Sequence, residues 1–412
     1  MKTDGLATAF ARSRILIVAV GGALMVSMPG CGGGDGVLSP GSGGTGSSVS
    51  TTAVGPISGF GSIIVNGVHY DDSGASVVDD SGRTLSSNGL RLGMMVRIEG
   101  SSNSSTGIGA ASAIQVFSEL KGTVESVAAD SIVVAGRTVR LLTSTVRDGF
   151  AVLSAGQFVE VYAFFDPGSG EFTATRVELK TPDEYKLRGL VTSWNATQQR
   201  FELGTIVVDY SGASLPGGFG VGRSVRVYAT AAPVGGQWQA SAVRISDDAS
   251  RSSSGDRIEV EGLVSSFVSR AEFSVGDYVV DASSATFEDG ALTDLVDGAL
   301  VEIEGTLQNG RAIASRVEFK SGSSSSSSGS AGGGSADDSF EIKGRIDTFT
   351  SLAQFSVRNT LIDASAGSVV FERGSAAGLA AGVCVEIKGA PVTGPQGTVV
   401  HASEVKFDND CQ

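Results

Sequence analysis

RIEVEGLVSSF (residues 257–267) opens a segment that continues through EFSVGDYVVDASSATF (272–287) and LVDGALVEIEG (295–305) and closes with AIASRVEFK (312–320). The same order of features, an early Gly, a paired-strand centre, a second Gly and a closing segment, occurs five times along the chain. The first Gly is Gly59, Gly122, Gly189, Gly262 or Gly344, and the second is Gly93, Gly156, Gly222, Gly298 or Gly382. Because self-similarity indicates an array of structural units, the repeat decides the architecture before any single motif does.

Apolar and polar residues alternate within these segments with the period of a β-strand. In Val301-Glu302-Ile303-Glu304 the apolar side chains fall on one face and the carboxylates on the other, the pattern of a half-buried strand. The sister segments read VRIE, VEVY, VRVY and VEIK. The recurring Gly fits a bend or a positive-φ position at a barrel corner.

A hairpin is predicted between the two Gly landmarks. In the segment quoted first, Phe273–Val275 and Tyr278–Asp281 flank Gly276-Asp277, and the last copy has Arg358-Asn359 at the same place. Two-residue turns of this composition between β-branched runs indicate a hairpin. No segment within a repeat shows a sustained helical period. We therefore predict an all-β chain, a tandem array of five small β-barrels of OB-like or SH3-like type, closed to leave no exposed edge.

The repeats and the connections between them divide the chain. We name repeats 1 to 5 for residues 53–117, 118–180, 184–246, 256–320 and 339–412. Repeats 1 to 3 follow one another closely, whereas the polar segments 247–255 and 321–338 precede repeats 4 and 5. Ser-rich and Gly-rich chain behaves as a flexible linker, so we expect a compact trio followed by two more loosely attached units.

The first 30 residues have the form of a targeting segment. A basic start is followed by the apolar stretch Ile15–Val26 and then by Cys31. This segment resembles the signal peptide of bacterial lipoproteins, in which the Cys is lipidated after cleavage. Residues 31–52 are then a Gly/Ser-rich tether, and Gly32 after the Cys implies the outer membrane. The alternative is an ordinary secretory signal that is cut elsewhere.

Three motifs carry a resemblance to a known family: Gly262-Leu-Val264, Val280-Asp281-Ala282 with Thr286, and Gly298–Gly305. With these motifs the chain from about Ala53 onwards resembles the bacterial domain-of-unknown-function family numbered 5666, often present in several copies. Repeat 2 departs from the pattern, with Arg140 where other repeats end the hairpin in Asp. The resemblance implies an envelope location, and it brings no known activity and no functional residues.

Composition and charge exclude some classes of function. The net charge is −14, and a barrel that binds nucleic acid needs a basic groove, so we expect no nucleic-acid partner. His69 and His401 are the two histidines, and neither lies in a nucleophile or zinc motif. We predict no catalytic residue, metal or cofactor. The Asp doublets, Asp79-Asp80 among them, fit solvated turns better than calcium loops, and the recurrent Asp209, Asp281 and Asp363 are interpreted as turn formers.

Cysteines and aromatic residues supply the remaining candidate sites. Cys384 and Cys411 lie near the last two strands of repeat 5, where antiparallel neighbours can bring them within bridging distance, so a disulfide is predicted. Repeat 3 holds both tryptophans, and Trp194 and Trp238 with Tyr210 and Tyr228 are the candidate ligand-binding residues. The competing interpretation is that these aromatic rings fill the barrel core.

The sequence therefore predicts a lipoprotein anchored in the outer membrane through Cys31, facing the periplasm or the cell surface. Its expected role is that of a non-enzymatic structural or binding scaffold in the envelope, with a polysaccharide or an envelope protein as partner. Two alternatives remain: an envelope carbohydrate-active hydrolase with a carboxylate site, and an inert stalk that presents repeat 5.

Overall fold

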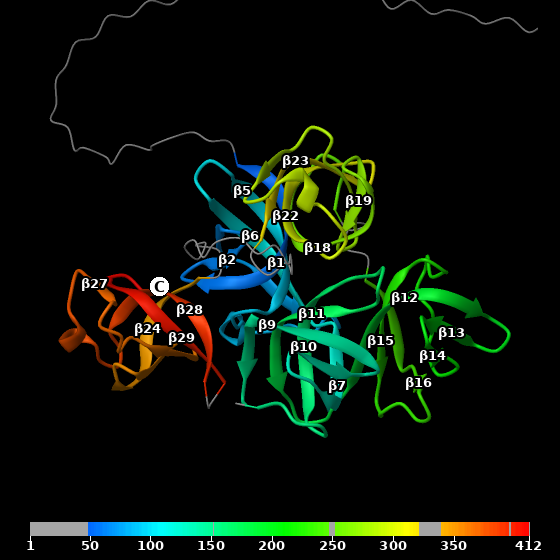
Figure 1. The fold of residues 1–412 in the computed structure, drawn as a ribbon, viewed down its shortest axis with the longest axis horizontal. Helices are drawn as coiled ribbons and strands as arrows, with labels where there is room; N and C mark the ends of the chain where they lie inside the picture. Colours follow the sequence, from blue (N-terminus) through cyan, green and yellow to red (C-terminus); the bar gives the residue numbers. More distant parts are fainter. Residues whose placement is uncertain (1–47, 151, 247–251, 321–338, 395–396, 412) are drawn as a thin grey trace, which may run out of the picture. The chain divides into compact units, whose positions relative to one another are not determined.

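The structure, a computed structural model, describes residues 48–150, 152–246, 252–320, 339–394 and 397–411. Figure 1 shows the strands of successive repeats, with labels that are kept below. Cys31 and the targeting segment lie outside the described residues, as do most of the two polar connections. The described part is built of β-strands and short 3₁₀ turns, and it confirms the all-β prediction.

Repeat 4 shows how each barrel closes. Its strands are β18 (Arg257–Ser269), β19 (Glu272–Val275), β20 (Tyr278–Asp281), β21 (Thr286–Glu288), β22 (Leu300–Gln308) and β23 (Arg311–Phe319). The long β18 pairs with β22 through its first half and with β19 through its second half. β19 and β20 form a hairpin, β20 runs parallel to β23, and β22 pairs with β23. These pairings close a five-stranded ring.

The other repeats have the same order of pairing. Repeat 1 contains β1 (Val49–Phe60), β2 (Ile63–Val65), β3 (Val68–Asp71), β4 (Ser76–Asp79), β5 (Met95–Asn103) and β6 (Ile108–Phe117). Repeat 2 contains β7 (Leu120–Val127), β8 (Ser131–Val134), β9 (Arg137–Asp148), β10 (Phe158–Phe165) and β11 (Phe172–Leu179).

Repeat 3 contains β12 (Tyr185–Asn195), β13 (Arg200–Leu203), β14 (Ile206–Asp209), β15 (Ser224–Ala229), β16 (Gln237–Gln239) and β17 (Ala242–Ile245). Repeat 5 contains β24 (Phe340–Ser351), β25 (Gln354–Val357), β26 (Thr360–Asp363), β27 (Val370–Glu372), β28 (Cys384–Gly394) and β29 (Gly397–Phe407). The closed order, with the third strand parallel to the last, is that of an OB-type barrel, so it decides between the two barrel types that the sequence left open.

The second Gly of each repeat occupies the predicted corner. All five have positive φ, between 76° at Gly93 and 89° at Gly156. The N–H of each donates at 2.8 Å to a carbonyl of the first strand, as Gly298 does to Val264. A residue with a Cβ adopts this conformation only at a cost, which explains why Gly recurs here.

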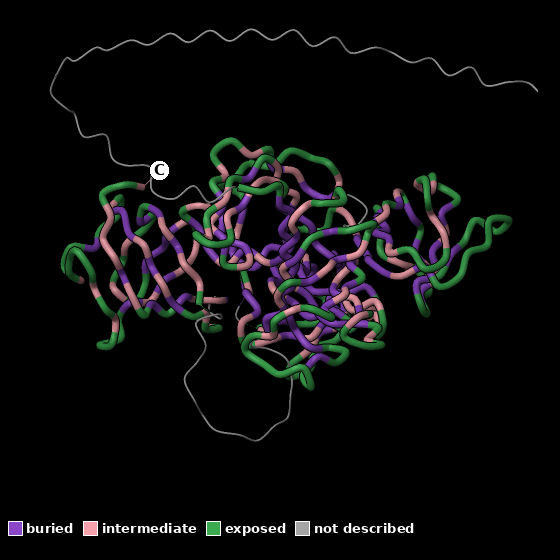
Figure 2. Tube along the Cα trace, turned by 90° about the horizontal axis from the view of Figure 1, so that it is seen from above, coloured by how far each residue is buried: buried purple, intermediate pink, exposed green. Residues whose placement is uncertain are grey.

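Apolar side chains from both halves of each ring fill the barrels. Figure 2 shows buried residues along the strands and exposed residues mainly in the connecting loops. In repeat 4 the core contains Val260, Phe273, Val280, Ile303 and Val317, the apolar members of the alternating segments. The alternation therefore predicted which face of each strand is buried.

Two expectations about the connections are wrong. The sequence predicts a tether that extends to residue 52, but β1 begins at Val49 and pairs with β5 from there. Repeat 4 is not loosely attached, because β1 also pairs in parallel with β18 from Thr51 opposite Arg257 to Val54 opposite Val260. The start of β24 in repeat 5 pairs with the end of β1 as well. The first strand of repeat 1 is thus shared among three repeats, an arrangement that residue alternation does not specify.

Candidate binding sites

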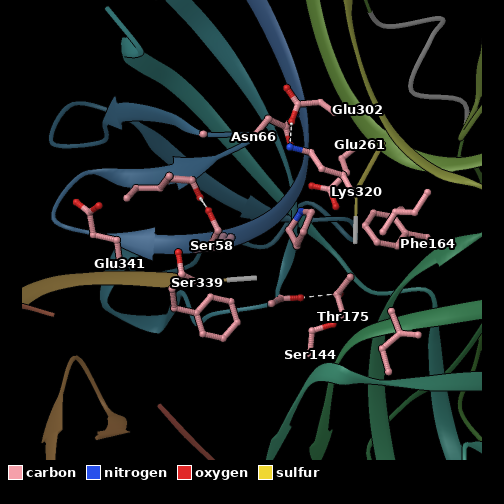
Figure 3. A pocket seen from close by; sticks show the side chains of 18 of the residues that line it. Ser58, Asn66, Ser144, Phe164, Thr175, Glu261, Glu302, Lys320, Ser339 and Glu341 are labelled. Atoms are coloured by element: carbon pink, nitrogen blue, oxygen red, sulfur yellow. Dashed lines mark hydrogen bonds and ion pairs between the residues drawn. The ribbon is translucent and has the colours of Figure 1, made fainter. Parts of the chain in front are cut away.

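A pocket of about 420 Å³ is lined by residues of repeats 1, 2, 4 and 5 (Figure 3). Its polar lining is Ser58, Asn66, His69, Ser144, Thr175, Glu261, Glu302, Lys320, Ser339, Glu341 and Lys388. Some of these groups already have partners: Ser58 donates to the carbonyl of Ile64 at 3.3 Å and Thr175 to that of Gly93 at 2.7 Å. The side chains of His69 and Ser144 make no hydrogen bond within the described chain, so they remain available to a polar ligand.

Three carboxylates of repeat 4 lie side by side next to this pocket. Glu302 is opposite Glu261 on β18 and opposite Glu318 on β23. Lys320 forms ion pairs with two of them, at 3.0 Å from Glu302 and 2.6 Å from Glu318. Arg316 lies 3.4 Å from Glu302. Burial raises the pKa of Glu302 to about 7, because removal from water disfavours the charged form. Burial, the largest single influence, would lower the pKa of Lys320, but the carboxylates of Glu302, Glu318 and Glu261 together outweigh it and raise this pKa.

The raised pKa of Glu302 predicts a pH dependence. Between its ordinary value of 4.5 and about 7 the folded chain holds a proton that the unfolded chain has lost. The free energy of unfolding should therefore fall as pH rises through this range, by up to about 3 kcal/mol. In Glu302→Gln the free energy of opening that hydrogen exchange reports for β22 should lose most of this pH dependence. The control Glu272→Gln, on an exposed side chain, should keep it. Equal pH profiles in all three proteins would contradict the assignment.

Buried charges join repeats 1, 3 and 4 around the start of repeat 2. Glu119, which lies just before β7 of repeat 2, is 1 % exposed and accepts hydrogen bonds from Arg188 of β12 and from Arg226 of β15, the latter at 3.0 Å. Lys186 lies 2.9 Å from both carboxylate oxygens of Asp80. We call these five residues, with Asp277, the junction network.

Asp277 connects the junction network to repeat 4. Arg188 donates from Nη2 to the carboxylate of Asp277 at 2.7 Å, while its Nη1 donates to Glu119. The guanidinium groups of Arg188 and Arg226 also lie over the rings of Phe165 and Phe117, at 4.8 and 5.0 Å from the ring centroids. Three cations therefore meet three carboxylates away from water. Such a balance is required for buried charges, since an unpaired one is strongly destabilising.

The junction network corrects one interpretation and leaves another intact. The sequence predicts a solvated turn at the doublet Asp79-Asp80, but both residues are buried, and Asp80 pairs with Lys186. The recurrent Asp209, Asp281 and Asp363 are turn formers, as predicted. Each accepts the N–H of the Ser two positions later, at 2.9, 2.9 and 2.8 Å, the Asx-turn geometry.

The four aromatic candidates of repeat 3 do not form one platform. Trp194 is 44 % exposed, donates from Nε1 to the Tyr210 hydroxyl at 3.0 Å, and packs edge-on against Phe219. Trp238 is 1 % exposed. Tyr228 points toward the junction network, where its hydroxyl donates to the carbonyl of Asp80 at 3.4 Å. Trp194 and Tyr210 therefore lie together, whereas Trp238 and Tyr228 are core or interface residues.

The two tryptophans should respond differently to a soluble quencher. Acrylamide should quench Trp194 and leave Trp238 almost untouched, because collision requires solvent access. Trp194→Phe should remove the quenchable fraction, and the matched variant Trp238→Phe should retain it provided that it folds. Emission that is quenched equally in both variants would show that Trp238 is accessible.

The predicted disulfide is confirmed between Cys384 and Cys411, whose Cα atoms lie 5.7 Å apart. In the described ranges no group of three or more His, Cys, Asp or Glu side chains is arranged to hold a metal ion. Nor do those ranges contain a helix long and apolar enough to cross a membrane.

Comparison with known proteins locates the family resemblance within the chain. The model of the domain of unknown function (DUF5666) matches residues 121–178, 261–318 and 343–406, which belong to repeats 2, 4 and 5. No curated protein matches the chain. Among solved structures, a chain titled "drosophila Unr CSD456" is 16 % identical, with 34 % of this chain and 72 % of that chain covered and a TM-score of 0.14. The chain thus carries tandem repeats that resemble a family of unknown function.

Proposed function

We propose that this chain, with repeats that resemble DUF5666, is an exported lipoprotein that acts as a non-enzymatic scaffold in the cell envelope. The observation that carries the scaffold role is the junction network, because buried ion pairs between repeats favour a fixed arrangement of barrels over a flexible string. A scaffold needs such an arrangement to present binding surfaces at constant spacing.

Export is supported by the sequence before Cys31 and by the disulfide of repeat 5. Disulfides persist in oxidising compartments and are rare in the cytosol. The lipid on Cys31 would anchor the chain in the outer membrane, with the barrels facing the periplasm or the cell surface. The membrane is then one partner, and a polysaccharide or an envelope protein is the other.

Fractionation tests the anchor. The wild-type chain should incorporate labelled palmitate and sediment with the outer membrane, and Cys31→Ser should lose the label and move to the soluble fraction. The matched control Cys411→Ser leaves the anchor intact and should sediment as the wild type does. A wild-type chain without palmitate, or a Cys31→Ser chain that remains in the membrane pellet, would contradict the lipoprotein assignment.

A hydrolase is the second candidate, favoured by the adjacent carboxylates of Glu261, Glu302 and Glu318. Glycosidases use two carboxyl groups with separated pKa values, and the raised pKa of Glu302 has that character. However, Glu302 is 2 % exposed and its oxygens face Lys320 and Arg316, so a substrate would have to displace these cations. Release of reducing sugar from envelope polysaccharide by the wild type but not by Glu302→Gln would favour the hydrolase over the scaffold.

A further inference from the structure

The last strand of four barrels has a neighbour that repeat 3 lacks. In repeat 4, β21 runs parallel to the second half of β23, and in repeat 5, β27 pairs with β29 in the same way. In repeat 1 the neighbour is β4, and in repeat 2 it is the end of β9. We call this element the covering strand. It satisfies the backbone groups on the outer edge of the last strand.

The corresponding segment of repeat 3, SGASLPGGF (residues 211–219), forms no strand. Pro216 lacks a backbone N–H, and the two glycines that follow are unfavourable in strands. The last strand, β17, pairs with β15, and none of the strands in the described ranges pairs with its other edge. Repeat 3 therefore has an open edge four residues long, from Ala242 to Ile245.

The side chains of β17 show what could add to this edge. Val243 is buried and pairs with Val227 in the way that Val317 pairs with Ile303 in repeat 4. The next residue, Arg244, is exposed. Its guanidinium group lies 5.8 Å from the centroid of the Tyr228 ring, and it forms no ion pair with a carboxylate of the described chain.

Repeats 4 and 5 give the chemistry of the missing strand. Opposite Val317 the covering strand places Phe287, and opposite Glu318 it places Glu288. In repeat 5 the same two positions are Phe371 and Glu372. Because neighbours in register point to the same face, a strand with this pattern on β17 would direct its aromatic residue inward beside Val243. Its carboxylate would lie beside Arg244.

We propose that the open edge of β17 binds an extended segment of another protein that runs parallel to it and carries an apolar residue followed by an acidic one. An exposed edge is a template for strand addition, with affinity from backbone hydrogen bonds and specificity from alternate side chains. The proposal rests on the scaffold function and names the class of its protein partner. A second copy of this chain fits less well, since each copy has a net charge of −14 and antiparallel pairing of β17 with itself gives Arg244 no carboxylate.

A labelled peptide provides the probe, because this chain contains a natural covering strand. Fluorescein-labelled SSATFEDG (residues 283–290) should bind the purified full chain saturably, with a Kd on the order of 100 µM, as expected for a short strand that must be ordered on binding. Arg244→Glu should weaken binding at least tenfold. The control Arg270→Glu, an exposed arginine of repeat 4, should leave the affinity unchanged.

Methylated peptides separate strand pairing from simple charge attraction. In a strand the N–H groups alternate between the two edges, so N-methylation of Phe287 alone, or of Thr286 and Glu288 together, blocks opposite edges. One of these peptides should lose binding and the other should retain it. Four results would each overturn the proposal. They are equal affinities for the two methylated peptides, no saturable binding at 1 mM, unchanged binding by Arg244→Glu, and self-association of the chain that Arg244→Glu abolishes. Because the titration uses purified protein, a failure of this proposal can be distinguished from a failure of the lipoprotein assignment, which fractionation tests.

Discussion

Glu119→Ala is expected to destabilise repeat 3 by about 3–5 kcal/mol, the cost of removing one partner from a buried ion pair. Arg188 and Arg226 would both lose the carboxylate that they share. Both tryptophans belong to repeat 3, so their fluorescence during urea unfolding reports on this repeat. The midpoint should move to a markedly lower urea concentration, with little change in slope if the unfolded ensemble is the same.

The matched control for this variant is Glu171→Ala. Glu171 is exposed immediately before β11, the last strand of repeat 2, and an exposed substitution of this kind is expected to change stability by less than about 0.5 kcal/mol. If Glu119→Ala and Glu171→Ala unfold at the same urea concentration as the wild type, the junction network contributes nothing to the stability of repeat 3.

Removal of the disulfide should have the next largest effect. The double variant Cys384→Ser/Cys411→Ser should lower the stability of repeat 5 by about 3 kcal/mol on the chain-entropy account, since the bond closes a loop between positions 27 apart. Hydrogen exchange in β28 and β29 should accelerate accordingly, while exchange in β22 and β23 of repeat 4 stays unchanged. A reducing agent should reproduce the effect in the wild type and have none in the double variant. Unchanged exchange in β28 and β29 would show that the bond does not stabilise this barrel.

The internal design of each barrel could be predicted from the sequence. The alternation in Val301–Glu304 indicated which face is buried, Gly298 marked the corner, and Gly276-Asp277 marked the hairpin turn. Each of these features depends on local geometry, which is why the residues specify it. The disulfide was predictable for a related reason, because Cys384 and Cys411 lie near the ends of neighbouring antiparallel strands.

The contacts between barrels could not be predicted in this way. Arg188 and Arg226 point away from the core of their own barrel, as alternation predicts, and an outward charge is ordinarily solvated. A second barrel covers them instead, and alternation contains no information about what covers an outer face. The same limit applies to Glu302, which alternation places on the outer face of β22 but which is 2 % exposed. Trp238 illustrates a different limit, since a tryptophan that fills a core and one that binds a ligand have the same strand position.

A double-mutant cycle between Asp80 of repeat 1 and Lys186 of repeat 3 tests the central claim, that buried ion pairs fix the barrels relative to one another. Asp80→Asn, Lys186→Met and the double variant are compared by urea unfolding followed through tryptophan fluorescence. The account predicts a coupling energy of at least about 1 kcal/mol, because residues in one buried network do not act independently. A coupling energy of zero, with the effects of the two single variants simply adding, would mean that repeats 1 and 3 are not held together through this pair.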